Sequence, residues 1–145
     1  MKKSPKTSSK AVFRALDANC NRVREGLRVA EDAARFLLDD ASLTSRLKAL
    51  RHGVTRAEGR LFKSPSLRSL SRDVEGDRGR GNREKSEKSR PTTQALFTAN
   101  LKRAQEGLRS LEEFSKLVRH PASTEFKKLR YACYRIEEKA ASRFE

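Results

Sequence analysis

Residues 18–28 read ANCNRVREGLR, and residues 99–109 read ANLKRAQEGLR. The two stretches keep several residues at the same spacing, so the chain contains an internal repeat. The identical pairs in and next to them are Ala18/Ala99, Asn19/Asn100, Arg22/Arg103, Glu25/Glu106, Gly26/Gly107, Leu27/Leu108, Arg28/Arg109 and Glu31/Glu112. Apolar positions between them change, as from Cys20 to Leu101. Because a core needs mainly apolar volume, the retained polar residues favour a function beyond a structural duplication.

Four apolar stripes with helical spacing account for most of the chain. The first consists of Leu16, Cys20, Val23, Leu27, Ala30, Ala34 and Leu38, which recur every three or four residues. The other three lie within residues 43–61, 97–118 and 126–140. No segment alternates with a period of two. We therefore predict an all-α fold: a four-helix arrangement of two duplicated antiparallel hairpins, at about 11–63 and 92–141, with pseudo-twofold symmetry.

Polar residues and prolines predict where these helices begin and end. Asp39-Asp40 and Ser42 are candidate N-caps of the second helix, and Thr92 or Thr93 of the third. Ser123 is the candidate for the fourth. His120-Pro121 predicts the end of the third helix, since a residue before proline avoids the α conformation.

The remaining segments are strongly charged. Residues 1–10, MKKSPKTSSK, predict a disordered basic tail ahead of a single helical domain at 11–145. Residues 64–91 predict a long loop with basic and acidic side chains between the hairpins. This loop is either a solvated linker or a functional lid or binding loop, because loops of this length are unusual in compact domains.

The charge balance predicts an anionic partner. The net charge is +15, which fits nucleic acid, acidic lipid or a phosphorylated small molecule. No apolar run reaches the ~18 residues of a membrane span, and the basic N-terminus lacks the apolar core of a secretory signal. We expect a cytoplasmic protein with no membrane partner. Cys20 and Cys133 lie on apolar stripes and predict buried, reduced thiols.

A helical wheel separates the repeated polar residues into two groups. One flank of the first stripe carries Asn19, Arg22, Glu25 and Gly26, with Asn19 and Gly26 at the core boundary. Arg28 and Glu31 do not lie on this flank, and from their own positions on the helix they could contact a neighbouring helix. A mid-helix glycine such as Gly26 costs roughly 1 kcal/mol relative to alanine, so it predicts either close helix contact or backbone exposed to a ligand.

The chemistry of this flank suits a phosphorylated ligand. Asparagine offers an amide oxygen and hydrogen-bond donors, arginine grips phosphate with two donors, and glutamate holds Mg²⁺ or orients an arginine. The alternative is a surface ion pair three residues apart. The candidates are Asn19 and Asn100 for substrate or metal, Arg22 and Arg103 for phosphate, and Glu25 and Glu106 for metal or arginine.

Two further sets of charged residues are candidates. The second helices of the two hairpins also match, at an offset of 79 residues, with identical pairs Lys48/Lys127, Leu50/Leu129, Arg51/Arg130, Arg56/Arg135 and Glu58/Glu137. Lys48 with Arg51, and Lys127 with Arg130, are spaced to share a helix edge, so they predict either anion clamps or solvated charge. In the loop, RDVEGD contains Arg72, a candidate phosphate-binding residue, and Asp73 and Asp77, which are candidate Mg²⁺ ligands. Acid–glycine clusters are also common in linkers. Neither GxxxxGK[ST] nor GxGxxG occurs, which excludes a P-loop or Rossmann nucleotide site.

Five segments in order resemble one known family: LDANCNRVREGLRVAEDAARF, LKALRHGV, RDVEGD, ANLKRAQEGLRSLEEFSK and FKKLRYACYRIE. The chain is similar over residues 13–138 to the small all-α hydroxymethylpyrimidine phosphate kinases of thiamine biosynthesis. These stand alone or precede a thiamine-phosphate synthase. The resemblance implies Mg²⁺- and ATP-dependent phosphorylation of 4-amino-5-hydroxymethyl-2-methylpyrimidine phosphate to its diphosphate. Since the chain ends at Glu145, we expect it to lack the synthase activity.

The resemblance also implies partners and roles. ATP and the pyrimidine phosphate would share a cleft, with one hairpin facing each. Arg22, Arg103, Arg51 and Arg130 would hold phosphates, and the carboxylates of Glu25, Glu106, Asp73 and Asp77 would hold Mg²⁺ or orient arginines. Either a homodimer or association with a separate thiamine-phosphate synthase fits this implication.

Two alternatives belong to other classes. A basic helical nucleic-acid-binding protein fits the net charge, but the repeated acids would repel a phosphate backbone, and the few aromatic residues lie mostly on the apolar stripes. A non-catalytic partner module of a thiamine-phosphate synthase predicts no ATP turnover.

Overall fold

The computed structural model describes residues 8–62, 73–79, 81, 89–118 and 120–145. Its regular elements are α1 (Ser9–Asp32), a π-helical turn η1 (Ala33–Leu37), α2 (Ala41–Leu61), α4 (Thr93–Leu117) and α5 (Ala122–Ala141). No strand occurs among the described residues. The predicted all-α fold of two helical hairpins is therefore confirmed.

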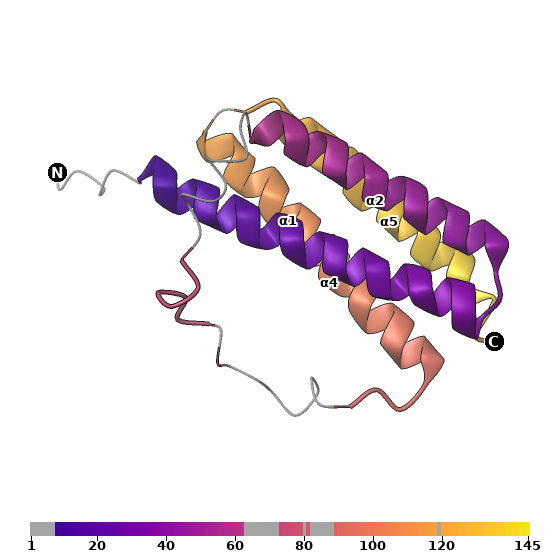
Figure 1. The fold of residues 1–145 in the computed structure, drawn as a ribbon. Helices are drawn as coiled ribbons and strands as arrows, with labels where there is room; N and C mark the ends of the chain where they lie inside the picture. Colours follow the sequence, from indigo (N-terminus) through magenta and orange to yellow (C-terminus); the bar gives the residue numbers. More distant parts are fainter. Residues whose placement is uncertain (1–7, 63–72, 80, 82–88, 119) are drawn as a thin grey trace, which may run out of the picture.

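The four helices form a square in which each packs against two neighbours (Figure 1). Helix α1 lies between α2 and α4, and α5 closes the square against the same two helices. Adjacent helices run antiparallel, while α2 and α4 lie on a diagonal and run in the same direction. The last turn of α2 and the first turn of α4 therefore lie at opposite ends of the bundle. Among the described residues, no helix is long and apolar enough to cross a membrane.

Burial follows the predicted stripes closely. The first stripe is buried from Leu16 to Ala34. The second stripe is buried at all six of its members, which are Leu43, Leu47, Leu50, Val54, Ala57 and Leu61. Leu38 is only partly buried because α1 ends in η1, where the Leu38 amide donates to the Ala33 carbonyl at 3.0 Å. This wider turn leaves Phe36 and Leu37 exposed.

The predicted caps are mostly confirmed. The Asp40 carboxylate accepts from the Leu43 amide at 2.9 Å, and the Thr92 hydroxyl accepts from the Ala95 amide at 3.0 Å. The Ser123 prediction was wrong, because α5 begins at Ala122, whose amide donates instead to His120 Nδ1 at 3.0 Å. Helix α1 begins at Ser9, so the last two residues of the predicted tail are helical, and residues 1–7 lie outside the described residues.

Gly26 and Gly107 allow α1 and α4 to approach closely. A Cβ atom on Gly26 would lie 2.6 Å from the backbone oxygen of Asn100. A Cβ atom on Gly107 would lie 2.6 Å from Val23 Cγ2 and 3.6 Å from the Asn19 oxygen. Because Asn19 and Asn100 are matching residues of the repeat, the two contacts are related by the pseudo-twofold axis. Of the two roles predicted for these glycines, the structure shows close helix contact.

We expect Gly26→Ala to destabilise the fold by about 1–3 kcal/mol, because the added methyl would push against helix backbone that cannot rotate away. Gly59→Ala is the matched control: it is a helical glycine with open space around its Cβ position. That change should stabilise the fold by about 0.5–1 kcal/mol. Urea unfolding of both variants measures the difference, and equal stability would contradict the close contact.

Cys133 is a fully buried free cysteine of α5. Burial, and next the nearby Glu137 carboxylate, raise its pKa to about 12. An unfolded cysteine titrates near pH 8.5, so the folded state keeps the proton that the unfolded state loses. Stability should therefore fall as pH rises from about 8.5 toward 12.

We expect wild type to lose about 1.5 kcal/mol of stability relative to Cys133→Val between pH 8.5 and pH 10. Valine is a suitable replacement because the matching position of the repeat is Val54, which is also fully buried. Unfolding curves at the two pH values measure the change. Parallel curves for the two proteins would show that this thiol does not titrate upon unfolding.

Candidate functional site

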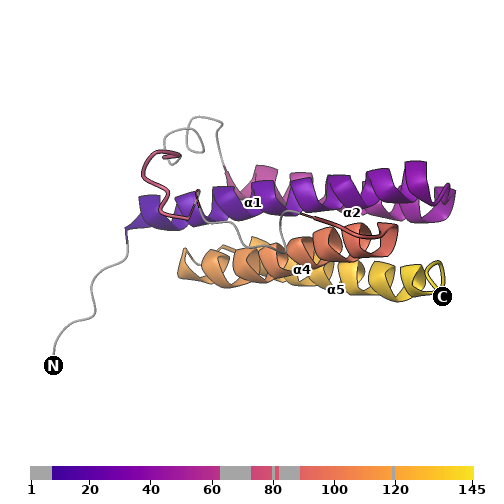
Figure 2. The ribbon, with the colours of Figure 1, turned by 90° about the horizontal axis from the view of Figure 1, so that it is seen from below.

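Two hollows lie on the outer side of the α1–α4 pair. The larger, called here the α4 cleft, has a volume of about 820 Å³. Its lining includes Glu25 and Gly26 from α1, Asn100, Lys102, Arg103 and Glu106 from α4, and Arg90 from the segment before α4. The view from below shows that segment entering α4 alongside this face (Figure 2).

The smaller hollow, called here the α1 cleft, has a volume of about 380 Å³. It is lined by the N-terminal half of α1 and by the segment at 73–77; its polar residues are Arg14, Asp17, Asn19, Arg22, Asp73 and Asp77. The repeat thus places Asn19 and Arg22 in one cleft and Asn100 and Arg103 in the other. Each hairpin thus supplies the asparagine and arginine of one cleft, and α1 also lines the α4 cleft with Glu25, Gly26 and Val29.

The two clefts adjoin along α1. Arg22 lines the α1 cleft, and Glu25, three residues later, lines the α4 cleft. Residues three apart are neighbours on a helix surface. The flank predicted from the helical wheel is therefore the boundary between the two hollows.

The two asparagines use their amide nitrogens on the helix backbone. Asn19 Nδ2 donates to the Ala15 carbonyl and Asn100 Nδ2 donates to the Leu96 carbonyl, both at 2.9 Å. The amide oxygen of Asn19 accepts from Arg22 Nη1 at 2.9 Å. Each asparagine therefore keeps one N–H donor and its carbonyl oxygen for other partners, and Asn19 uses the oxygen to orient Arg22.

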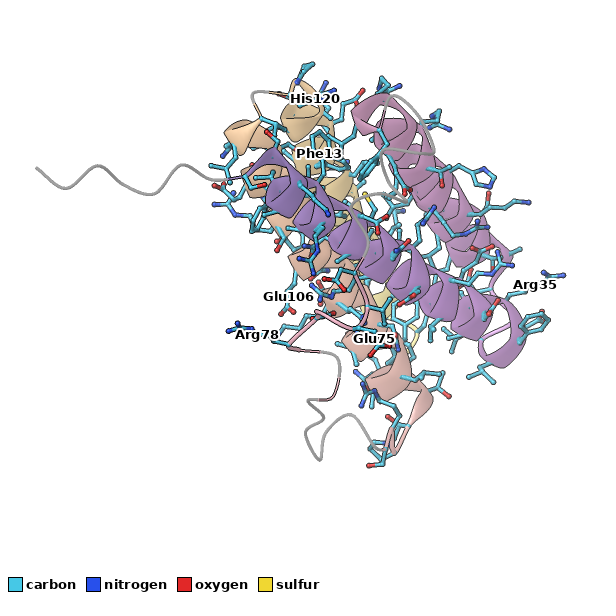
Figure 3. The ribbon with its side chains drawn as sticks, turned by 60° about the vertical axis from the view of Figure 1, so that its left-hand side comes forward. Phe13, Arg35, Glu75, Arg78, Glu106 and His120 are labelled. Carbon is cyan, nitrogen blue, oxygen red and sulfur yellow. The ribbon has the colours of Figure 1, made fainter. Side chains whose placement is uncertain are left out.

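Arg103 reaches across from α4 to α1. Its Nη2 atom lies 3.9 Å from Glu25 Oε2, and both side chains are more than half exposed. An exposed pair at this distance contributes little to stability, so the guanidinium can turn to a phosphate without a large loss. Glu106 projects from α4 on the same side of α1 as the segment that carries Glu75 and Arg78 (Figure 3).

The acidic segment is held by its own backbone. The Gly76 amide donates to Asp73 Oδ1 at 2.8 Å, and the Gly79 amide donates to Asp77 Oδ1 at 3.0 Å. Arg14 Nη2 lies 3.7 Å from Asp73 Oδ2, which ties the segment to α1. Arg72 lies outside the described residues.

The carboxylates fit a metal that arrives with its phosphate ligand. No group of three or more potential ligands is preassembled in the described part of the chain. Asp73 and Asp77 nevertheless line the α1 cleft together, and each has one oxygen apart from the one that accepts a glycine amide. Mg²⁺ is commonly held in this way, by one or two carboxylates together with substrate phosphates.

Arg51 and Arg130 lie elsewhere, inside the hairpins. Arg51 Nε donates to Glu31 at 2.8 Å, and Arg130 Nη2 donates to Glu112 at 2.9 Å. Both glutamates are buried. The sequence led us to expect these arginines in the same cleft as Arg22 and Arg103. The structure instead pairs each of them with a buried glutamate inside its hairpin. It also confirms that Glu31 meets the neighbouring helix.

A second polar pair joins the two helices of each hairpin, at matching positions of the repeat. Arg24 pairs with Glu58 at 3.0 Å, and at the matching positions Gln105 donates to Glu137 at 2.7 Å. These pairs fix the register of each hairpin. Lys48 and Lys127 are exposed on α2 and α5 and line neither of the two clefts described above.

Several cleft residues escaped the sequence analysis because they are not repeated. Lys102 matches Asn21, Arg14 matches Ala95 and Asp17 matches Thr98. When the two copies are compared, these positions differ and therefore do not stand out as candidate site residues. Their one signal in the sequence was proximity to a repeated residue, as with Lys102 beside Arg103.

Comparisons with known proteins show which family the sequence matches. A family model described as the ThiD2 family matches residues 14–139. A thiamine-phosphate synthase of Rhodopirellula baltica is 42% identical over 126 residues, which are 87% of this chain and 33% of the relative. Another, from Thermosynechococcus vestitus, is 38% identical over 135 residues, 93% of this chain and 37% of the relative. The chain spans about a third of these relatives. No solved structure matches.

The pairing of Arg51 with Glu31 predicts a stability effect. We expect Arg51→Ala to lower the free energy of unfolding by about 2–4 kcal/mol, because it leaves the buried Glu31 carboxylate without its arginine. Arg56→Ala, an exposed change on the same helix at another repeated position, should alter stability by less than about 0.5 kcal/mol. Denaturant unfolding measures both. Equal values would mean that the Arg51 pair is not structural.

Proposed function

The chain belongs to the ThiD2 family, and from this premise we propose that it acts in thiamine biosynthesis as a kinase. The reaction transfers the γ-phosphoryl group of ATP to 4-amino-5-hydroxymethyl-2-methylpyrimidine phosphate and yields the diphosphate and ADP. One observation carries the proposal: two adjoining clefts, related by the repeat, each present an arginine beside a carboxylate.

The pair of clefts suits a reaction between two anions. Two phosphorylated substrates repel each other, so a site that brings them together needs fixed positive charge on both sides. Arg22 with Arg14 supplies it in the α1 cleft, and Arg103 with Lys102 supplies it in the α4 cleft. Phosphates held in this way would meet at the boundary between Arg22 and Glu25.

The chemistry needs little covalent participation by the protein. The acceptor is a phosphate oxygen that already carries negative charge at neutral pH, so no general base is required. This oxygen forms a bond to the γ-phosphorus as the bond from that phosphorus to the β-phosphate oxygen breaks, and ADP leaves. Positioning and charge neutralisation supply the rate enhancement in reactions of this type.

Mg²⁺ fits the carboxylates at the edge of each cleft. Asp73 and Asp77 would hold it in the α1 cleft, and Glu25 and Glu106 are the acidic side chains that line the α4 cleft. When bound, the ion neutralises phosphate charge during transfer. Asn19 keeps Arg22 oriented, and Glu25 draws Arg103 over the boundary between the clefts.

A coupled assay of ADP release tests the proposal. Wild type should release ADP only when the pyrimidine phosphate is present. Arg22→Ala and Arg103→Ala should each lower kcat/KM by about 100-fold, because each removes a cation from a developing phosphate charge. Arg28→Ala is the matched control, since Arg28 is exposed on the same helix and lines neither cleft.

Two results would contradict the proposal. Turnover near that of wild type in both arginine variants would remove the shared site. Absence of pyrimidine-dependent ADP release from wild type would instead favour a non-catalytic module that works with a thiamine-phosphate synthase, since matching relatives are much longer proteins of that name.

A further inference from the structure

A third hollow, of about 320 Å³, lies on the outer side of α4 and α5. It is lined by Lys102, Gln105, Glu106, Arg109 and Tyr134. Two of these residues, Lys102 and Glu106, also line the α4 cleft. The two hollows therefore adjoin at these side chains, and a long ligand could extend over them from one hollow to the other.

Tyr134 lines this hollow, and its ring is held in position by contacts with two other residues of α5. Arg130 Nη1 donates to the Tyr134 hydroxyl at 3.2 Å, and its guanidinium lies 5.7 Å from the ring centroid. Tyr131 packs against the same ring edge-on, with centroids 5.7 Å apart. Since Glu112 binds Arg130 in turn, the buried pair of the hairpin also fixes the tyrosine.

This aromatic wall breaks the pseudo-symmetry of the molecule. Tyr134 matches Thr55 on α2, Tyr131 matches His52, and Lys102 matches Asn21. The two copies nevertheless keep the buried ion pair of each hairpin, Arg51 with Glu31 and Arg130 with Glu112. The two halves thus differ where a planar, uncharged group could stack, and this difference distinguishes the substrates they would take.

We propose that the adenine ring of ATP stacks on Tyr134, with its triphosphate extending over Lys102 to Arg103 in the α4 cleft. The α1 cleft then takes the pyrimidine phosphate. Stacking on an aromatic side chain is a common way to hold a nucleobase. The larger cleft adjoins the aromatic hollow, whereas the α1 cleft, with about 380 Å³, suits the smaller substrate. The assignment rests on the proposed function and states which hairpin binds the nucleotide.

Calorimetric titration with a non-hydrolysable ATP analogue tests the stacking contact without turnover. Tyr134→Ala should raise the dissociation constant at least about fivefold, and Tyr134→Phe should keep most of the affinity because it retains the ring. Inorganic triphosphate has no base to stack, so its affinity should be equal in wild type and Tyr134→Ala. Thr55→Ala, at the matching position of the first hairpin, should bind the analogue as wild type does.

Kinetics separate this assignment from the proposed function. In the ADP assay Tyr134→Ala should raise the KM for ATP and leave the KM for the pyrimidine phosphate unchanged. Turnover by wild type with an unchanged KM for ATP in Tyr134→Ala would overturn the stacking site and leave the kinase proposal standing. Failure of wild type to bind the analogue would overturn both.

A structural role of Tyr134, without base binding, would give a different pattern of binding and kinetic changes. If Tyr134→Ala weakened inorganic triphosphate and the ATP analogue equally, or raised both KM values together, the tyrosine would shape the hairpin and would not bind the base. Circular dichroism of the variant checks folding. Tyr134→Leu, which keeps apolar bulk without an aromatic face, should show the same loss of analogue affinity as Tyr134→Ala.

Discussion

The close contact between α1 and α4 is the constraint on which the rest of the structure depends. At Gly26 and Gly107 the absence of a side chain lets one helix lie against the backbone or Val23 of the other. This approach sets the two repeated flanks side by side, so that Arg22 and Arg103 face neighbouring hollows on one surface. Larger residues at the two glycines would separate the helices and move the arginines apart. The helical cost of a glycine, roughly 1 kcal/mol, is thus offset by a geometry that no other residue permits.

The retained polar residues divide between two tasks. Glu31 with Arg51, and Glu112 with Arg130, join the two helices of each hairpin through a buried carboxylate. Asn19, Arg22 and their copies instead line the clefts. Conservation of both groups between the two copies has one physical origin, since a buried carboxylate needs its partner as strictly as a ligand site needs its charge. The repeat of a residue in both copies therefore does not tell whether that residue stabilises the fold or binds a ligand.

Departures from the repeat carry the complementary information. The two hairpins share a framework, but the α1 cleft adds Arg14 and the aspartates at 73 and 77, whereas the α4 side adds Lys102 and Tyr134. A symmetric pair of identical sites would suit two identical ligands. The kinase reaction proposed above would need two different ligands whose phosphates meet, and a duplicated scaffold that diverges at the outer parts of its two clefts suits that need.

The sequence by itself determined the helices, their apolar faces, the repeat and the family, because these depend on local spacing that a helix imposes on its own residues. It also placed Asn19, Arg22, Glu25 and Gly26 on one flank. It could not decide which flank the neighbouring helix would cover, so Arg51 and Arg130 were grouped with the cleft arginines although they face buried glutamates. Only the tertiary structure settled that, because the packing of α1 against α4 and the position of residues 73–77 and 89–91 beside these helices join residues whose proximity no spacing along the sequence encodes.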